Sequence, residues 1–364
     1  MVKNQKDMNI VNKQTLNDLR FIHNNYYGKN FLKNKKILIT GAGGFVGYYL
    51  SLYLIKYKKE LKIKKILLTD IKIKNILPKI KFFKNTANFA IKKFDVIKDD
   101  INKLIPNDIN VIIHAASVAS PTKYRKEPLQ TADANVIGLR KILEFAKKNE
   151  KIKILYFSSS EIYGDPDIKN IPTKEAYNGN VSTTGPRACY DEAKRYCETL
   201  AYIFNKKFKT KISIVRPFNN FGPGMNISDL RLPSDMAKSI LNKKKIFLFS
   251  NGSPKRSFCY IADAVVGYLE ALSYKTFEIF NIGNTKEMSV LQFAKLFSRA
   301  SNKIYKYTPK IIFKKNKDKD YLINNPNRRS PDISKARKLL KYHPKINTYN
   351  GIVNYLKFLK ENNR

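Results

Sequence analysis

The chain has 364 residues, of which 43% are hydrophobic and 12% aromatic, a composition that excludes general disorder and supports one large or two modest domains. No apolar run of about 18 residues is present, which excludes a membrane-spanning helix. The formal net charge is +41, and only 13 of the 70 basic residues are Arg, so the positive charge comes almost entirely from lysines. Because these lysines are spread along the chain, the charge indicates a solvated lysine coat rather than a specific nucleic-acid partner.

Residues 1–34 are polar and lack the apolar stretch of a secretory signal, so they are predicted to form an N-terminal extension. The three cysteines, Cys189, Cys197 and Cys259, have no metal-ligand spacing and cannot all pair. They indicate reduced thiols and a cytoplasmic protein, and no metal site is predicted.

Short apolar strands alternate with amphipathic stretches from residue 36 to residue 216. The strands are predicted at 36–40, 65–70, 111–116, 153–158 and 212–215, and the intervening helices include 48–57, 135–148 and 190–204. This alternation predicts an α/β fold with a Rossmann-type doubly wound parallel sheet that helices cover on both faces.

Beyond residue 216 the pattern becomes irregular, and it ends in helical stretches near 289–300 and 333–341. We therefore predict a Rossmann domain over 35–216, with a return segment near 259–284. A smaller, discontinuous substrate-binding lobe is predicted over 217–258 and 285–360.

A glycine-rich turn, Gly41-Ala42-Gly43-Gly44-Phe45-Val46-Gly47, connects the first strand to a helix. Such a turn lets the backbone approach a pyrophosphate, which the helix N-terminus then faces. Asp70 ends the next strand, where a carboxylate accepts a hydrogen bond from a ribose 2′-OH and repels a 2′-phosphate. The pattern predicts NAD rather than NADP, although Lys72 nearby weakens the preference. Asp95, after the third strand, is a candidate for the adenine end or a strand-end turn residue.

Tyr190 and Lys194 are four residues apart at the start of a predicted helix, so they share one face. A Lys ammonium beside a phenol favours the phenolate, which can remove a hydroxyl proton during hydride transfer to NAD. Ser158-Ser159-Ser160-Glu161 ends a strand at the carboxyl edge of the sheet, where ligands bind in such folds. Ser159 is a candidate to hydrogen-bond the reacting oxygen, and Glu161 to act as a base or to orient a water; the alternative is a structural turn.

Together these motifs resemble the extended short-chain dehydrogenases that modify nucleotide sugars, and among them the UDP-glucuronate decarboxylases. The resemblance covers about residues 35 to 345. Besides the glycine turn and the serine motif, it is carried by His114-Ala-Ala-Ser-Val-Ala-Ser-Pro121 with Tyr124, Gly185-Pro-Arg-Ala-Cys-Tyr-Asp-Glu-Ala-Lys194, Lys255-Arg-Ser-Phe-Cys-Tyr260 and Asn327-Arg-Arg-Ser-Pro-Asp-Ile333.

The resemblance implies that Tyr190 and Lys194 support oxidation of the sugar at C4, with Ser159 on the reacting oxygen. CO2 then leaves from the C6 carboxylate, which is β to the C4 ketone, and NAD is regenerated in each cycle. Ser160 and Glu161 match the catalytic pair near C5, and Arg256 matches the Arg that meets the carboxylate.

The resemblance also implies a nucleotide-sugar substrate and a homodimer formed by the helices that bear Asn135 and Tyr190. The implied cofactor-binding residues are Gly41, Gly44, Phe45, Val46, Gly47, Asp70, Asp95, Ala115, Ala116, Ser117, Asn135, Tyr190 and Lys194. The implied substrate-binding residues are Ser120, Tyr124, Arg187, Asn219, Arg256 and Arg329.

Two segments depart from the decarboxylase pattern, and both lie on the substrate side. Gly222-Pro-Gly-Met225 stands where those enzymes read Gly-Pro-Arg-Met, and the stretch 229–235 also differs. A nucleotide-sugar 4,6-dehydratase or 4-epimerase therefore remains the alternative, although Ser160 favours decarboxylation over dehydration and Glu161 is mildly unfavourable for an epimerase. A dehydrogenase that releases NADH, and a nucleic-acid-binding protein with a retired Rossmann fold, remain further alternatives.

Overall fold

The computed structural model describes residues 11–76, 81–83, 89–314, 323 and 325–362, so residues 1–10 of the predicted extension and 315–322 of the predicted lobe lie outside the described residues. Within this part of the chain, no helix is both long and apolar enough to cross a membrane.

A seven-stranded sheet with the order β11-β6-β5-β4-β1-β2-β3 forms the centre of the molecule, and all of its neighbouring strands pair in parallel. Its strands are β1 (Lys36–Thr40), β2 (Lys65–Asp70), β3 (Ala90–Lys93), β4 (Val111–His114), β5 (Lys153–Phe157), β6 (Lys211–Pro217) and β11 (Glu278–Ile282). The predicted Rossmann-type parallel sheet is therefore confirmed.

Alternate residues of each strand pack into two different cores, as the period of two in a β-strand requires. In β1, Ile37 and Ile39 belong to one apolar cluster and Leu38 belongs to the other. Both faces of the strands are apolar because helices cover both faces of the sheet.

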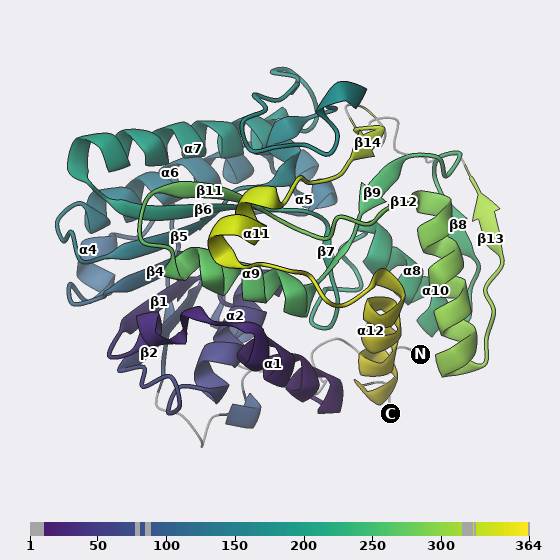
Figure 1. The fold of residues 1–364 in the computed structure, drawn as a ribbon, viewed down its shortest axis with the longest axis horizontal. Helices are drawn as coiled ribbons and strands as arrows, with labels where there is room; N and C mark the ends of the chain where they lie inside the picture. Colours follow the sequence, from purple (N-terminus) through teal and green to yellow (C-terminus); the bar gives the residue numbers. More distant parts are fainter. Residues whose placement is uncertain (1–10, 77–80, 84–88, 315–322, 324, 363–364) are drawn as a thin grey trace.

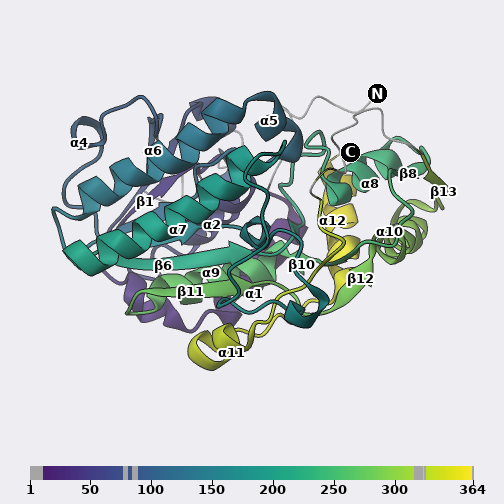
Figure 2. The same cartoon turned by 90° about the horizontal axis from the view of Figure 1, so that it is seen from above.

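Two layers of helices provide this cover (Figures 1 and 2). One layer contains α6 (Pro128–Ala146), α7 (Ala188–Phe208) and the short α4 (Ile101–Leu104), and the other contains α2 (Phe45–Lys56), α9 (Ile261–Ser273) and α1 (Lys13–Asn25). Helix α6 begins at Pro128, seven residues before the start predicted for the helix at 135–148. Pro128 stands at the first helical position, which tolerates Pro.

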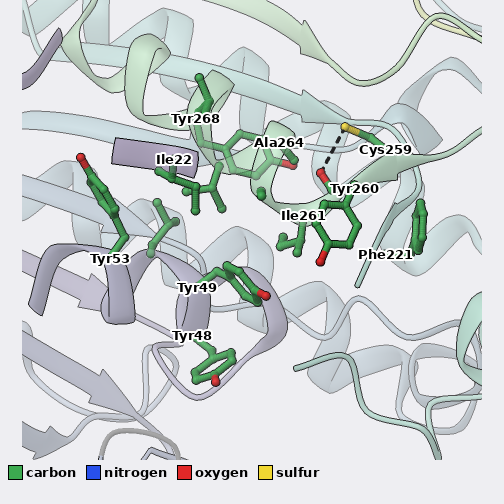
Figure 3. Packing of buried hydrophobic residues seen from close by; sticks show 14 of the residues in the cluster. Ile22, Tyr48, Tyr49, Tyr53, Phe221, Cys259, Tyr260, Ile261, Ala264 and Tyr268 are labelled. Atoms are coloured by element: carbon green, nitrogen blue, oxygen red, sulfur yellow. Dashed lines mark hydrogen bonds between the residues drawn. The ribbon is translucent and has the colours of Figure 1, made fainter. Parts of the chain in front are cut away.

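Helix α1 is part of the fold, although it lies in the predicted extension. It packs Leu19 and Ile22 into the same core as α2 and α9, and Figure 3 shows Ile22 among the tyrosines of these helices. The side chain of Asp18, on the same helix, accepts hydrogen bonds from the hydroxyls of Tyr49 at 2.9 Å and Tyr260 at 2.8 Å. Residues 11–25 therefore connect α2 to the chain segment just before α9.

Most of the remaining elements lie at the carboxyl ends of the central strands, and α8, α10 and α12 gather at one end of the molecule (Figures 1 and 2), whereas α11 packs beside α9 and the edge strand β11. These elements are α5 (Pro121–Lys126), β7 (Asn220–Phe221), α8 (Leu232–Leu241), β8 (Ile246–Leu248), β9 (Lys255–Ser257), β10 (Cys259–Tyr260), β12 (Glu287–Ser289), α10 (Val290–Tyr305), β13 (Ile311–Phe313), β14 (Arg328–Arg329), α11 (Ser334–Leu340) and α12 (Thr348–Asn362). They form three small sheets, β10-β7, β12-β9-β14 and β13-β8.

Candidate active site

A cleft of about 1170 Å³ lies between the carboxyl edge of the central sheet and the smaller sheets. All of the predicted site residues except Asn135 line it: Gly41, Gly44, Phe45, Val46, Gly47, Asp70, Asp95, Ala115, Ala116, Ser117, Ser120, Tyr124, Ser159, Ser160, Glu161, Arg187, Tyr190, Lys194, Asn219, Arg256 and Arg329. The fold therefore brings together residues that are almost 290 positions apart in the chain.

The glycine-rich turn forms a backbone cradle at one end of the cleft. Gly41 has a φ of +67°, and a Cβ there would lie 2.7 Å from the Cα of Ala116. A Cβ at Gly47 would lie 2.2 Å from the carbonyl oxygen of Gly41. Only glycine fits these two positions, and Gly44 caps α2 so that free backbone N–H groups point into the cleft. This cradle fits the diphosphate of a dinucleotide.

Asp70 lies beside this cradle at the end of β2. One of its carboxylate oxygens accepts the N–H of Gly43 at 3.0 Å, and the other accepts the N–H of Lys72 and the side-chain amide of Asn75, each at 3.2 Å. The carboxylate is thus fixed in place, at the position expected for a contact to a ribose hydroxyl.

Two further predicted cofactor residues have structural partners. Asp95 lines the cleft, and its carboxylate also accepts the N–H of Ile97 at 2.9 Å, which is the turn role considered as its alternative. Asn135 is 1% exposed and lies behind the wall of the cleft, where its side chain accepts the hydroxyl of Ser117 at 2.8 Å.

Tyr190 and Lys194 lie on the first turns of α7 and are both buried. The ammonium of Lys194 lies 5.7 Å from the centroid of the Tyr190 ring and donates to the carbonyl of Phe157 at 2.6 Å. The ring of Tyr124 stacks on Tyr190, with centroids 5.3 Å apart and an interplanar angle of 11°. The phenol is therefore held between an aromatic ring and a cation.

Burial raises the pKa of Tyr190 to about 12, and a hydrogen bond with the Ser159 side chain opposes this rise. Burial lowers the pKa of Lys194 to about 8. Ser159 itself caps a short 3₁₀ turn, residues 160–163, by accepting the N–H of Glu161 at 3.2 Å. This turn after β5 places the Ser159 hydroxyl next to the Tyr190 phenol.

Glu161 is held by two arginines. Arg329 donates from its two terminal nitrogens to the two carboxylate oxygens of Glu161, each at 2.7 Å, and Arg187 forms a second ion pair with it. Burial alone would raise the pKa of Glu161, but Arg187 and Arg329 outweigh it and hold the pKa well below its usual range. Glu161 is therefore a carboxylate at neutral pH, and Arg187 and Arg329 are engaged with it.

Arg256 differs from these two arginines because no carboxylate pairs with it among the described residues. Its guanidinium is 8% exposed and donates to the carbonyls of Lys255 at 2.8 Å, Asn327 at 3.2 Å and Pro326. Burial and the nearby charge of Arg329 lower the pKa of Arg256 to about 9. A buried cation that faces a cleft and makes no direct ion pair is suited to an anionic group of a ligand.

Two other predicted substrate-binding residues are fixed by backbone groups. Asn219 has a φ of +39° and donates from its side chain to the carbonyl of Ser257 at 3.0 Å. Ser120 donates to the carbonyl of Asp229 at 3.3 Å. Both contacts connect the sheet edge to the segments that close the cleft from the other side.

Two charged groups of the cleft region, Asp191 and Arg231, received no site role from the sequence. Asp191 is buried behind the site, 3.4 Å from Nε of Arg187, and burial together with the charge of Glu161 raises its pKa to about 7. Arg231 lines the cleft and pairs with Asp229. The signal for Arg231 was present, since it lies in the 229–235 stretch that departs from the decarboxylase pattern.

The other departure has a steric explanation. Gly224 has a φ of +81°, and a Cβ there would lie 2.6 Å from the ring of Tyr48. Tyr48 is 1% exposed and cannot easily give way, so this site has no room for an arginine at position 224.

The described residues contain no group of three His, Cys, Asp or Glu side chains that could hold a metal ion. Around the Tyr190 phenol, the cleft offers the hydroxyls of Ser159 and Ser160, the carboxylate of Glu161 and several guanidiniums. Such a set can bind an anionic ligand and exchange a proton with one of its hydroxyl groups.

Comparison with known proteins agrees with this geometry. UDP-glucuronic acid decarboxylase 6 of Arabidopsis thaliana is 32% identical over 329 residues, which cover 89% of this chain and 88% of that protein. UDP-glucuronic acid decarboxylase 1 of Xenopus tropicalis is 33% identical over 319 residues, which cover 87% and 70% of the two chains. The UDP-glucuronic acid 4-epimerase of Bacillus cereus, solved with UDP-glucuronic acid and NAD, has 25% identity and a TM-score of 0.73, covering 90% of this chain and 99% of that one.

The sequence profile of one family covers most of the chain. The family is described as the NAD dependent epimerase/dehydratase family, and its profile matches residues 37–283, from the first strand of the sheet to the end of β11. The match spans the glycine turn, the serine motif and the Tyr190–Lys194 pair. The chain therefore belongs to the NAD dependent epimerase/dehydratase family.

Proposed function

We propose that this protein is a NAD-dependent enzyme that decarboxylates UDP-glucuronate to UDP-xylose. The observation that carries the proposal is Arg256, a buried guanidinium without a carboxylate partner in the same cleft as Tyr190 and the glycine cradle. A neutral hexose would leave this charge unpaired in a buried site, which is unfavourable, whereas a sugar carboxylate would neutralise it. The relatives named UDP-glucuronic acid decarboxylase support the same substrate.

The cofactor site is assigned to the cradle of Gly41, Gly44 and Gly47, with Asp70 on a ribose. When bound, NAD supplies the acceptor and later the donor of the hydride at C4 of the sugar. Tyr190 takes the proton of the C4 hydroxyl as a phenolate, a form that the ammonium of Lys194 and the positive ring of bound NAD would favour, and its oxygen lies beside Ser159. Ser159 holds the oxygen of that hydroxyl during the proton transfer.

A ketone at C4 is β to the carboxylate, so CO2 can leave while the electron pair of the broken C–C bond collects in an enolate. Protonation at C5 restores the ketone, and return of the hydride restores the C4 hydroxyl. Arg256 fixes the carboxylate before the bond breaks, and the burial of its guanidinium strengthens this interaction. Ser160 lies at the same turn as Ser159 and is 3% exposed, so it can orient the group that returns a proton to C5. Glu161 is paired with Arg187 and Arg329, so it contributes a negative charge that these two arginines hold in a fixed position.

The test is to incubate the purified protein with UDP-glucuronate and to follow the mass of the nucleotide sugar, with and without added NAD. The expected result is a product lighter by the mass of CO2 and no net formation of NADH. Unchanged substrate, with a folded protein that binds NAD, would overturn the proposal.

A 4-epimerase acting on the same substrate is the second candidate. The ion pairs that hold Glu161 favour it, because an epimerase needs no free carboxylate base. The solved UDP-glucuronic acid 4-epimerase of Bacillus cereus also shares the fold. In the same experiment, an epimerase would give a product of unchanged mass with an inverted C4, which sugar analysis distinguishes from the starting material.

We also propose a cytoplasmic homodimer and a division into a Rossmann domain and a substrate-binding lobe with the predicted boundaries. The three cysteines are unpaired, which suits a reducing compartment. The outer surfaces of α6 and α7 expose the large apolar side chains Ile137, Tyr196, Tyr202 and Ile203. Apolar exposure on two adjacent helices is typical of an interface between subunits.

A further inference from the structure

Arg216 lies in β6, behind the cleft and outside the set of groups that act on the substrate. Its side chain is buried and does not line the cleft. We propose that Arg216 is a positioning residue that fixes the two catalytic segments, the 160–163 turn and helix α7, relative to each other. The proposal rests on the proposed function, because it concerns how the groups of that reaction are aligned.

The first contact of Arg216 is to α7. Nε and one terminal nitrogen of Arg216 donate to the two carboxylate oxygens of Glu198, at 2.9 and 2.5 Å. Glu198 is 8% exposed and lies one helical turn after Lys194, so both residues are on the same side of α7. Because this ion pair is buried and joins two atoms to two atoms, it fixes both the distance and the orientation of the helix relative to β6.

The second contact is to the turn after β5. The other terminal nitrogen of Arg216 donates to the hydroxyl of Tyr163 at 2.6 Å and to the carbonyl of Glu175 at 2.9 Å. The centre of the guanidinium also lies 4.9 Å from the centroid of the Tyr163 ring. Tyr163 is fully buried and ends the turn that begins with Ser160 and contains Glu161. One guanidinium therefore connects the catalytic turn to the catalytic helix.

The Tyr163 hydroxyl extends this connection to the chain segment that carries Arg329. It donates to the side-chain oxygen of Asn281 in β11 at 2.7 Å, and Asn281 is fully buried. The side-chain nitrogen of Asn281 donates to the carbonyl of Asp332 at 3.0 Å, three residues after Arg329. The hydroxyl thus joins the guanidinium to the segment whose Arg329 binds Glu161.

The relative position of these segments matters because the proposed reaction needs groups from both. Ser159 and Ser160 lie at the turn, whereas Tyr190 and Lys194 lie on α7. The Ser159 hydroxyl must remain beside the Tyr190 phenol if both are to contact one sugar hydroxyl. A displacement of reacting groups by about 1 Å can reduce a rate by about 100-fold. A buried hydrogen-bond network that resists such a displacement therefore contributes to turnover without touching the ligand.

The test is Tyr163→Phe, which keeps the ring and removes only the hydroxyl between Arg216 and Asn281. We expect kcat for UDP-glucuronate, measured per folded enzyme, to fall by about 10- to 100-fold. Binding of UDP, measured by calorimetry, should be retained, because none of the altered contacts lies in the cleft. Arg216→Lys should lose kcat as well, because an ammonium lacks the planar fork that binds Glu198 and Tyr163 together.

Tyr26→Phe is the matched control. Tyr26 is 1% exposed and lies away from the cleft, and its hydroxyl makes hydrogen bonds with the carbonyl of Gly28 at 2.8 Å and with Ser273 at 2.6 Å. Both substitutions leave buried polar groups unpaired, so both should lower the melting temperature. Only Tyr163→Phe should lower kcat. A normal kcat in folded Tyr163→Phe, or the same loss of kcat in Tyr26→Phe, would overturn the proposal.

Hydrogen exchange separates this proposal from the proposed function. The N–H of Glu161 donates to the Ser159 side chain at 3.2 Å, and the N–H of Gly164 donates to the carbonyl of Glu161 at 3.0 Å. These amides should exchange faster in Tyr163→Phe than in the wild type or Tyr26→Phe, whatever the reaction is. Unchanged exchange would also overturn the proposal. Faster exchange, with a wild type that binds NAD and UDP-glucuronate and releases no CO2, would overturn only the decarboxylase assignment.

Discussion

At the scale of single residues, the phenol of Tyr190 is the group whose removal should have the largest effect on turnover. It is buried between Tyr124 and Lys194 and lies beside the Ser159 hydroxyl, so no other acid or base of the described site is equally placed. Tyr190→Phe keeps the ring and its stacking and removes only the hydroxyl. We expect kcat to fall by about 10²–10⁴-fold, the usual contribution of a positioned acid–base group.

The measurement is single-turnover conversion of UDP-glucuronate by mass spectrometry, with NAD binding measured in parallel. NAD should still bind, because the cradle of glycines is untouched. Tyr202→Phe, on the outer surface of the same helix, is the matched control and should keep wild-type turnover. A Tyr190→Phe enzyme with normal kcat would remove Tyr190 from the mechanism.

Arg256 gives a second test at this scale, because its role is selectivity for a carboxylate. Arg256→Gln should weaken binding of UDP-glucuronate by about 10- to 100-fold, as expected for loss of a hydrogen-bonded charge pair, and should weaken UDP-glucose much less. Calorimetry with both ligands measures the difference. Arg328→Gln is the control, since Arg328 is 38% exposed and pairs with Glu287 outside the cleft. Equal losses for the two ligands would contradict the assignment.

The residues of the site were largely predictable from sequence, but their partners were not. The glycine turn, Ser159, Tyr190 and Lys194 occur in local motifs whose spacing reports their geometry. The ion pair between Glu161 and Arg329 joins residues 168 positions apart, and nothing in the local sequence of either indicates the other. Arg329 was predicted to bind the substrate, and its ion pair with Glu161 is a contact that only the folded chain reveals.

At the scale of elements, strands with uninterrupted apolar residues were predictable and polar or irregular ones were not. Lys36–Thr40 and Lys65–Asp70 were placed with their observed bounds because both of their faces are buried. Glu278–Ile282 forms the edge strand β11 and begins with a half-exposed Glu, so it was seen only as part of a return segment. The packing of α1 against the core could not be predicted, because its buried surface includes Asp18 and a charged residue type is expected at the surface.

Asp18 makes the stability of this helix dependent on pH. Burial raises the pKa of Asp18 from 3.8 to about 7, although the hydrogen bonds from Tyr260, Tyr49 and Gln14 lower it in part. Since the folded pKa is above the unfolded one, the stability that protonated Asp18 contributes is complete below about pH 4 and is lost as the pH rises toward 7. The difference between 3.8 and about 7 corresponds to about 4 kcal/mol.

Asp18→Asn removes this titration and keeps an oxygen that can accept from the tyrosine hydroxyls. The free energy of unfolding of the wild type, relative to that of the variant, should therefore fall by up to about 4 kcal/mol between pH 4 and pH 7. Urea unfolding at pH 4.5, 6 and 8 measures it. Asp263, whose pKa is also raised to about 6, is present in both proteins, and its charge contributes to the raised pKa of Asp18. Parallel pH curves for the two proteins would show that Asp18 does not titrate in this window.

At the scale of the whole molecule, the proposed homodimer depends on the surface of α6 and α7. On α7, Tyr196, Tyr202 and Ile203 are 52%, 48% and 46% exposed, and Ile137 on the adjacent α6 is 38% exposed. On the opposite face of α7, Tyr190 and Lys194 point into the cleft. The same helix would thus serve the site on one side and a second copy on the other, with no overlap between the two roles.

A single charge introduced on this surface should disrupt the proposed interface and leave the site on the other face of α7 intact. Ile203→Glu would bury a carboxylate in the proposed interface, and an unpaired buried charge is strongly unfavourable. Sedimentation at micromolar concentration should give twice the mass of one chain for the wild type and the mass of one chain for the variant. Leu339→Glu, which places the same charge on α11 at a site 39% exposed, should remain dimeric. Because Ile203 lies away from the cleft, the separated chains should still bind NAD. A wild type that sediments as single chains, or an Ile203→Glu protein that remains paired, would show that this surface is not the interface.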